Sequence, residues 1–350
     1  FSSSPCRGNM PVSAADLDRL GQELSEPIGT RHDQSIEILV NHLRHSLPRN
    51  IQPRIEIARI VRGGSLHKNT AIRKHFDCDL VMLFRMAFRD FCTESEQKRL
   101  KQSLLKSLEL EGLEVDPAAS EHPHPSASCT FHGIKFDVLV GASQIGGGGR
   151  KDWSRKQLED VQGYVLRRGY WKSVEAARSL SASASESAVK IICAETEILR
   201  RTVVLLKQWR DFHELPKLKS FVLELIALEA AYQLRSRGSK VHTCRRLFVQ
   251  CMDILDLSEV TARDPRILTL EHLGLYDPHA WRDLIFDPEQ TLYLVRRHRL
   301  HILNPMTPNL CVLFSVPCQA LQAWSDAACQ TRSMMEHSRT RVVDVFGVGL

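Results

Sequence analysis

The sequence lacks the features that direct a chain into or across a membrane. It contains no apolar run of about 18 residues, the length that a spanning helix requires, and no secretory signal segment. Its ten cysteines include no C-x-x-C pair and follow no regular spacing. These absences predict a protein of the cytoplasm, or of the nucleus, with no membrane partner. The chain begins at Phe1 instead of Met, so the sequence leaves open a further segment upstream.

The sequence also has little net charge. Its 47 Lys and Arg residues against 41 Asp and Glu residues give a formal charge of +6, which permits a polyanionic partner without requiring one. The basic residues gather in a few places, so a basic face and a surface of scattered, solvated charges are both open. The clusters lie at 54–74, 200–210, 245–246 and 296–299.

The length and the hydrophobic patterning predict two lobes. A chain of 350 residues can bury one large core or two smaller ones. We expect an α+β fold in which a mixed sheet forms the first lobe and helices form the second. The expected parts are a flexible N-terminal segment at 1–29, a mixed-sheet lobe at 30–186, a helical lobe at 187–332 and a C-terminal tail at 333–350.

Periodicity and turn residues predict the elements of these lobes. Apolar residues at helical spacing predict an amphipathic helix at about 32–47, which Pro48 ends. The Ser- and Ala-rich stretch 179–187 marks the boundary between the lobes. The other expected elements are extended stretches at 55–61, 80–84 and 131–140, a surface helix at 94–110, and helices near 191–206, 220–235 and 242–256.

Acidic residues open two of the apolar stretches. Asp77 and Asp79 form a D-x-D pair before 80–84, and the two-residue period of a strand turns both carboxylates to the same side. Asp137 precedes the apolar residues 138–140. If the two strands are neighbours, the three acids can share hard divalent cations, which prefer oxygen ligands. The pattern predicts a two-metal site for phosphoryl transfer, with Asp77, Asp79 and Asp137 as metal ligands and catalytic residues.

A glycine turn precedes the D-x-D pair. Gly63 and Gly64 would let the backbone approach triphosphate oxygens, and Ser65 would donate hydrogen bonds to them. Lys68 would add a positive charge. A lone G-G-S is typical of an ordinary loop and a lone D-x-D of a solvated strand end. Their order before an apolar strand, with a later Asp before a second one, is much more specific.

These motifs resemble those of a known superfamily. Segments 61–65 (Val-Arg-Gly-Gly-Ser) and 77–81 (Asp-Cys-Asp-Leu-Val) resemble the signature of the polymerase-beta-like nucleotidyltransferases, above all that of the 2'-5'-oligoadenylate synthetases. The similarity spans about residues 30–330. It implies a bilobal nucleotidyltransferase fold, ATP and GTP as substrates, and two Mg²⁺ ions with Mn²⁺ as an alternative. It also implies double-stranded RNA as an activator that lies across a basic face.

Later segments extend the resemblance. Segment 205–209 (Leu-Leu-Lys-Gln-Trp) resembles the family's lysine-plus-tryptophan helix, which implies that Lys207 contacts phosphate. The oligoadenylate synthetases usually have Gln-Tyr where this chain has Ser220 and Phe221. Those two residues resemble cyclic dinucleotide synthases and their cGAS-like relatives, in which the serine touches phosphate and the aromatic ring stacks on a base. The RNA-binding face that the resemblance implies contains Arg44, Arg49, Arg62 and Lys190, for each of which an ordinary solvated charge is the alternative.

The leading hypothesis from the sequence is an enzyme of antiviral innate immunity. It would polymerise ATP into 2'-5'-linked oligoadenylates, release pyrophosphate and respond to double-stranded RNA. A cGAS-like cyclic dinucleotide synthase, a catalytically inactive RNA-binding relative and a nucleotidyltransferase that needs an RNA acceptor stay open. The sequence contains no cluster of His and Cys like the zinc-binding insert of cGAS.

Overall fold

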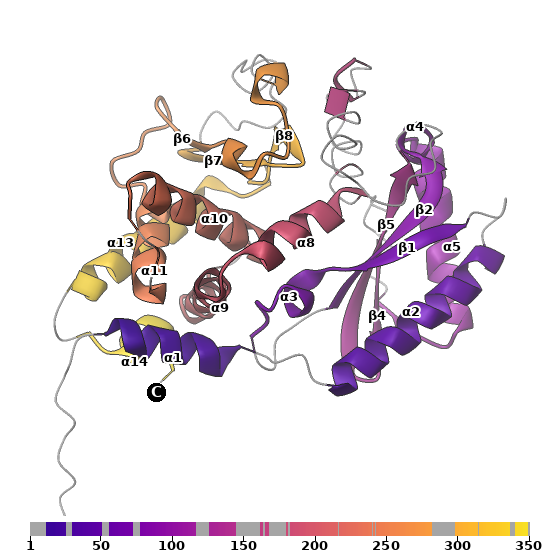
Figure 1. The fold of residues 1–350 in the computed structure, drawn as a ribbon, viewed down its shortest axis with the longest axis horizontal. Helices are drawn as coiled ribbons and strands as arrows, with labels where there is room; N and C mark the ends of the chain where they lie inside the picture. The colour runs from indigo at the N-terminus through magenta and orange to yellow at the C-terminus, as the bar shows by residue number, and fades with distance from the viewer. Residues whose placement is uncertain are drawn as a thin grey trace, which may run out of the picture.

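The chain folds into two lobes that lie side by side (Figure 1). The computed structural model describes residues 12–25, 30–50, 56–72, 78–116, 126–144, 162–163, 165–167, 180, 183–215, 217–239, 241, 243–281, 298–313, 315–336 and 340–348. Residues 30–144 contribute a five-stranded sheet with its covering helices, which we call the sheet lobe. The elements from residue 185 onward form a mainly helical lobe. The expected α+β architecture with two lobes is confirmed.

The sheet of the first lobe is mixed. Its strand order is β1-β2-β5-β4-β3, in which β2 and β5 are parallel and the other neighbours are antiparallel. The strands are β1 (Ile57–Arg62), β2 (Cys78–Ala87), β3 (Glu114–Val115), β4 (Ser126–Phe131) and β5 (Ile134–Gln144). Because β2 is apolar on both sides, it occupies the interior of the sheet.

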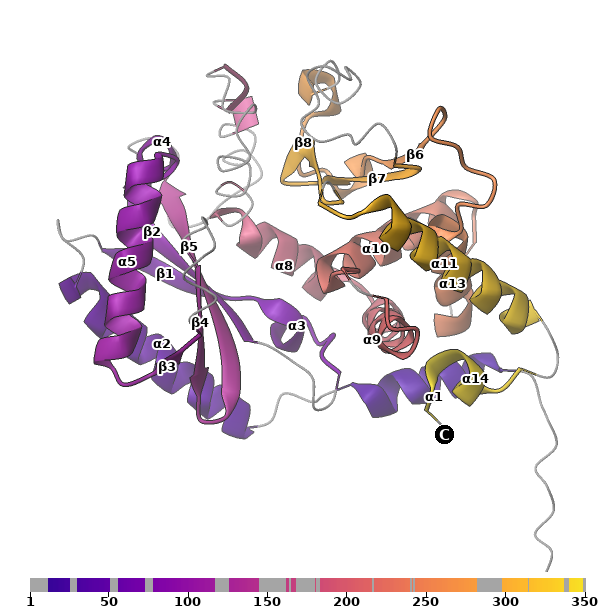
Figure 2. The ribbon, with the colours of Figure 1, turned by 180° about the vertical axis from the view of Figure 1, so that it is seen from behind.

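Alternating residues of β2 serve two different cores. Leu80, Met82 and Phe84 pack under α2 (Thr30–Asn50) and α5 (Glu94–Leu110), which cover one face of the sheet (Figure 2). Val81 and Leu83 point to the opposite face, where they form a small cluster with Val61. The face that α2 and α5 leave uncovered is therefore the one that carries the odd-numbered residues of β2.

The long helix α2 differs from the expectation at its end. It runs to Asn50, past Pro48, which we expected to end it. A proline lacks the N–H of the helical ladder and its ring crowds the carbonyl four residues before it, but here both effects fall near the end of the helix, which continues for two more residues. Short helices α3 (Gly64–His67) and α4 (Phe88–Phe91) follow β1 and β2.

The helical lobe is built around one helix that is apolar on nearly all sides. This helix, α10 (Ser220–Ser236), buries ten of its residues and lies among the other helices, as a helix without a polar face must. The helix α9 (Glu197–Phe212) is capped by Thr196, whose side chain accepts a hydrogen bond from the Leu199 backbone N–H. The remaining helices are α8 (Ser185–Ala194), α11 (Cys244–Leu255) and α13 (Cys318–Glu336).

Both ends of the described chain pack into this lobe. Residues Ala14–Leu24 form α1, whose Leu17 and Leu20 are buried in the core of the helical lobe. A second helix, α14 (Val342–Phe346), buries Phe346 in the same core. Figures 1 and 2 both show α1 and α14 beside α9. The segments expected as a flexible start and a tail therefore contain packed helices.

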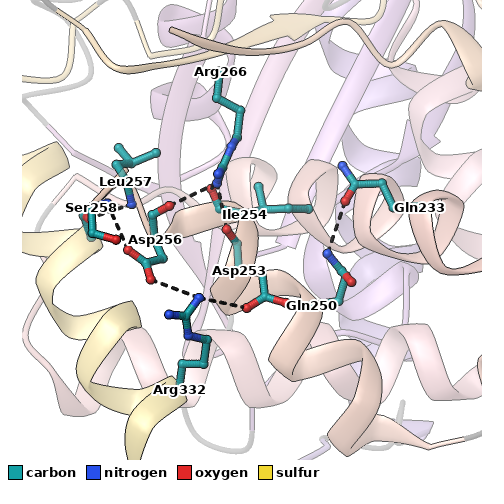
Figure 3. A network of polar contacts seen from close by, with 10 residues as sticks. Gln233, Gln250, Asp253, Ile254, Asp256, Leu257, Ser258, Arg266 and Arg332 are labelled. Atoms are coloured by element: carbon teal, nitrogen blue, oxygen red, sulfur yellow. Dashed lines mark hydrogen bonds and ion pairs between the residues drawn. The ribbon is translucent and has the colours of Figure 1, made fainter. Parts of the chain in front are cut away.

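A second sheet, which the sequence did not reveal, covers part of the helical lobe. It contains β6 (Arg266–Leu268), β7 (Leu300–Asn304) and β8 (Thr307–Cys311), and β6 leads to a short 3-10 helix η3 (Glu271–Leu273). Arg266 of β6 donates hydrogen bonds through Nη1 to the carbonyl oxygens of Asp253 at 2.7 Å and Asp256 at 3.1 Å, at the end of α11 (Figure 3). Arg332 of α13 reaches the Asp256 carboxylate at 3.2 Å. These contacts fasten β6 and α13 to the C-terminal end of α11, where unpaired carbonyl groups favour a cation.

None of the helices in the described residues is long and apolar enough to cross a bilayer.

Candidate active site

The structure brings two of the three predicted acids together. Asp79 of β2 and Asp137 of β5 are direct partners in the parallel register of these strands. Both are odd-numbered positions, so they lie on the sheet face that α2 and α5 leave uncovered. The Asp79 charge acts on Lys207 of α9, which indicates that this face turns toward the helical lobe. Asp77 lies outside the described residues.

The glycine turn lies directly against Asp79. The Gly63 N–H donates to the Asp79 carbonyl oxygen at 2.7 Å. Gly64 has a φ of +72°, and a Cβ at this position would lie 2.7 Å from Asp79 Oδ2. Only glycine combines this left-handed backbone with such a close approach. The turn predicted to receive phosphate and the carboxylate predicted to hold a cation are thus in contact.

Asp137 is held from the neighbouring antiparallel strand. Ser128 of β4 is its register partner, and the Ser128 hydroxyl donates a short hydrogen bond to Asp137 Oδ1. One carboxylate oxygen is therefore fixed by Ser128, and the other remains for a proton or a cation.

Lys68 does not point into solvent. Its Nζ lies 2.8 Å from Glu224 Oε2 of α10, and the side chains are only 11% and 4% exposed. This ion pair links the short helix after the glycine turn to the central helix of the other lobe. A positive charge close to the turn, as the sequence predicted, is therefore present together with a buried partner that the sequence analysis did not identify.

Lys207 turns toward the same part of the sheet lobe. Its Nζ donates to the Thr70 carbonyl oxygen at 2.8 Å and lies 3.2 Å from Thr70 Oγ1, and the side chain is 3% exposed. Burial lowers the pKa of Lys207 to about 8, a fall that Lys68 and Arg210 increase and that Glu224 and Asp79 oppose. The lysine thus belongs to the buried interface of the two lobes.

Ser220 and Phe221 begin the central helix α10. The Arg210 guanidinium donates to Ser220 Oγ at 3.2 Å and to the Leu218 carbonyl oxygen at 3.3 Å. Phe221 is partly buried against the core of the helical lobe. Their predicted contacts with a nucleotide stay predictions, but both residues lie three to four positions before Glu224, which pairs with Lys68.

The four residues predicted to bind RNA differ in their surroundings. Arg44 and Arg49 of α2 and Lys190 of α8 are exposed. Arg62 of β1 pairs with Glu37 and lies 3.5 Å from Asp33, both of α2. Figure 1 shows α2 and α8 toward the same side of the molecule, one in each lobe. A common face that spans both lobes is compatible with this arrangement, whereas Arg62 already has acidic partners.

The donor set around Asp79 fits a hard cation better than a soft one. The thiol next to it, Cys78, is buried, and burial raises the pKa of this thiol to about 12, so it stays protonated. Carboxylate oxygens from Asp79 and Asp137 remain, which are ligands for Mg²⁺ or Mn²⁺. No group of three His, Cys, Asp or Glu side chains suited to a metal ion occurs within the described ranges, and Asp77, the predicted third ligand, lies outside them.

Comparisons with known proteins give the fold. No protein-family model matches the sequence, and no curated protein is similar to it. Solved structures are similar over nearly the whole chain. CdnC of E. coli MS115-1, in complex with HORMA-deltaN, has 17% sequence identity and a TM-score of 0.58, with 96% of this chain and 97% of that chain covered. A cytoplasmic RNA terminal U-transferase has 14% identity and a TM-score of 0.58 over 96% and 98% of the two chains.

A third similar structure is the Cid1 poly(U) polymerase with Mg 3'-dATP, at 14% identity and a TM-score of 0.58 over 95% and 98% of the two chains. At these identities the similarity concerns the fold and not the substrate. The chain has the bilobal α+β fold of the nucleotidyltransferases.

Proposed function

We propose that this chain is a nucleotidyltransferase, which joins a nucleoside triphosphate to a ribose hydroxyl and releases pyrophosphate. The observation that carries this proposal is the register pair Asp79–Asp137 on adjacent parallel strands, with the Gly63-Gly64 turn against Asp79. Phosphoryl transfer uses acids that hold cations and backbone N–H groups that bind phosphate, and this point of the sheet offers both. An inactive relative would have no need to keep this combination.

In the proposed mechanism the residues of this chain position charge. Asp79 and Asp137, together with Asp77, would hold two Mg²⁺ ions, and the ions would supply positive charge to the attacking oxygen and the departing pyrophosphate. Asp137, fixed through Ser128, accepts the proton of the attacking hydroxyl. The N–H groups of Gly64 and Ser65 and the Ser65 hydroxyl would bind the triphosphate, because the Gly63 N–H is taken by the Asp79 carbonyl oxygen. Lys68 lies beside the turn, where Glu224 compensates its charge.

For the product we propose 2'-5'-linked oligoadenylates made from ATP, with double-stranded RNA as the activator. The support is the resemblance of segments 61–65 and 77–81 to the oligoadenylate synthetases, and the exposure of Arg44, Arg49 and Lys190. RNA bound in this way contacts proteins through phosphates and 2'-hydroxyls, so its effect would weaken strongly with salt.

A cyclic dinucleotide product is the second candidate. It is favoured by Ser220 and Phe221 at the start of α10, where Arg210 orients the Ser220 hydroxyl. The similarity to CdnC, which has been solved with ATP, agrees with a nucleoside triphosphate substrate for either product. The similarity to a poly(U) polymerase supports a third, in which an RNA end is the acceptor.

One experiment separates these products. The purified chain is incubated with labelled ATP, GTP or UTP and Mg²⁺, with double-stranded RNA, a single-stranded RNA primer or neither, and the products are resolved before and after phosphatase treatment. RNA-dependent ladders that phosphatase shortens support the oligoadenylate proposal. A resistant dinucleotide supports the cyclic candidate, and extension of the primer supports the third.

Matched variants test the assigned acids. Asp79→Asn and Asp137→Asn keep the side-chain volume and should lower the rate at least about 100-fold. Asp264→Asn changes an exposed aspartate in the turn before β6 and should leave the rate unchanged. Full activity of the Asp79 variant would show that the metal site has been assigned to the wrong residues.

A further inference from the structure

A short segment of the sheet lobe is held by elements of the helical lobe. Residues 69–72 follow α3 in the connection toward β2, and Thr70 is fully buried among them. The Thr70 N–H donates to the Ser65 carbonyl oxygen at 2.8 Å, which anchors the segment to the glycine turn. Asn69 adopts a left-handed φ of 54°, which costs energy for a residue other than glycine and persists where surrounding contacts impose it.

The first contact from the helical lobe comes from Lys207. Two of its three ammonium protons can be used by Thr70, through the carbonyl oxygen at 2.8 Å and the hydroxyl at 3.2 Å. With the side chain 3% exposed, the ammonium group faces the segment 69–72 and not open solvent. A buried ammonium group needs such partners, so the bonds to Thr70 are strong determinants of where this backbone lies.

The second contact comes from α1. Ser25, at the end of this helix, pairs with Ile72 as an isolated antiparallel β-bridge. The helix itself is firmly docked, because Leu17 is fully buried and the Asp18 carboxylate accepts a hydrogen bond from the Cys244 N–H at the start of α11, at 3.2 Å. A Cβ at Gly21 would lie 3.1 Å from the Cβ of Arg201, so α1 packs closely on α9.

The held segment lies in the sequence between the glycine turn and Asp79. The segment follows Ser65 and Lys68, and Ile72 precedes Asp79 by seven residues. A shift of 69–72 would therefore move the phosphate-binding turn at one end and the start of β2 at the other. We propose that Lys207 and helix α1 are positioning elements of the active site, which set the place of the acids and the turn through Thr70 and Ile72.

This inference rests on the proposed function for its effect on rate, but its structural part can be tested without any substrate. Leu17→Ala loosens α1, and Lys207→Met removes the hydrogen bonds to Thr70. Leu321→Ala is the matched control, since Leu321 of α13 is also buried in the helical-lobe core, at 4% exposed against 0% for Leu17, and belongs to neither contact. Each variant of the full chain is measured at the same number of degrees below its own Tm. Amide hydrogen exchange of peptides that cover 65–72 should then be faster than in the wild type for Leu17→Ala and Lys207→Met only.

The kinetic part distinguishes positioning from direct phosphate binding. If Lys207 and α1 position the site, Leu17→Ala and Lys207→Met should lower kcat by about 10- to 100-fold and leave the KM for the triphosphate within about twofold. Leu321→Ala should keep the wild-type kcat. A higher KM with an unchanged kcat in the Lys207 variant, or unchanged exchange at 65–72 in the Leu17 variant, would overturn the proposal. If the wild-type protein forms no product, the proposed function is refuted. The structural part of the inference is still tested by the hydrogen-exchange experiment, which needs no substrate.

Discussion

Removal of the Glu224 carboxylate provides a quantitative test of the interface between the lobes. At the 2.8 Å separation from Lys68 Nζ, Coulomb attraction amounts to about 6 kcal/mol at an effective dielectric constant of about 20, before the cost of taking both charges out of water. That cost cancels most of the gain for an intact buried pair. Breaking the pair leaves a buried charge without compensation and costs about 3–5 kcal/mol.

The variant Glu224→Gln should therefore lose about 3–5 kcal/mol of unfolding free energy, measured by urea denaturation. It leaves Lys68 and Lys207 as neighbouring positive charges, and because Glu224 normally opposes the fall in the pKa of Lys207, that pKa should drop further below about 8. The double variant with Lys68→Met removes the stranded ammonium group as well. It should cost about as much as one single change and not their sum.

A surface pair supplies the control. Arg85 and Glu56 lie 3.1 Å apart, but their side chains are 53% and 63% exposed. Glu56→Gln should change the unfolding free energy by less than about 1 kcal/mol. Additive effects of the Lys68 and Glu224 changes, or a Glu224 variant as stable as the Glu56 variant, would refute the assignment of a buried, coupled pair between the lobes.

Three further predictions concern the close contact of Gly64 with Asp79, the ion pair of Arg332 with Asp256, and the protonation of His301. Gly64→Ala places a Cβ against the Asp79 carboxylate at a φ of +72°. It should lower the reaction rate about 100-fold but cost only about 1–3 kcal/mol of unfolding free energy in urea. A loss of rate that the smaller fraction of folded protein explains by itself would contradict this. Arg332→Met leaves the buried Asp256 carboxylate without its guanidinium and should cost about 1–3 kcal/mol, seen as a lower Tm; an unchanged Tm would mean that the contact in Figure 3 is not stabilising. Burial lowers the pKa of His301 to about 4, so as the pH falls the unfolded chain binds a proton at this histidine before the folded chain does. The folded protein should therefore lose up to about 3 kcal/mol of stability between pH 6.5 and pH 4. In urea unfolding at pH 5 and pH 7, the His301→Asn variant should show a smaller difference in stability than the wild type.

The part of the site that could be predicted from the sequence is the part encoded locally. The apolar runs after Asp79 and Asp137 indicated strands, and the pair of glycines before them indicated a turn that admits a close ligand. The metal-site prediction depended on the condition that β2 and β5 are neighbours. Local patterns do not specify this pairing, because parallel strands are joined by a long crossover connection. The register of Asp79 with Asp137 confirms this condition.

The unpredicted parts depend on contacts between distant residues. Glu224 is an acid within the apolar run of α10, a pattern that indicates a buried charge. Its partner could not be predicted from this pattern, because Lys68 lies 156 residues away. The helix α1 is amphipathic and well capped, yet its packing partners come from α9 and α11. The strands β6 and β7 are short, and their pairing joins residues more than 30 positions apart, so neither shows a hairpin pattern.

The packing of α1 and α14 on opposite ends of the chain has a consequence for synthesis on the ribosome. Chain growth is sequential, and domains fold in the order in which their residues emerge. The five strands of the first sheet lie between residues 57 and 144 and can pair while the rest is being made, but Tyr276, Trp281 and Leu303 join its core only later. The helix α1 emerges before it but must wait for α9, and the contact of α14 with α9 forms last. A ribosome-bound intermediate would thus carry paired strands next to an α1 that lacks its partners, with the exposed apolar residues of α1 as a target for chaperones until the helical lobe packs around them.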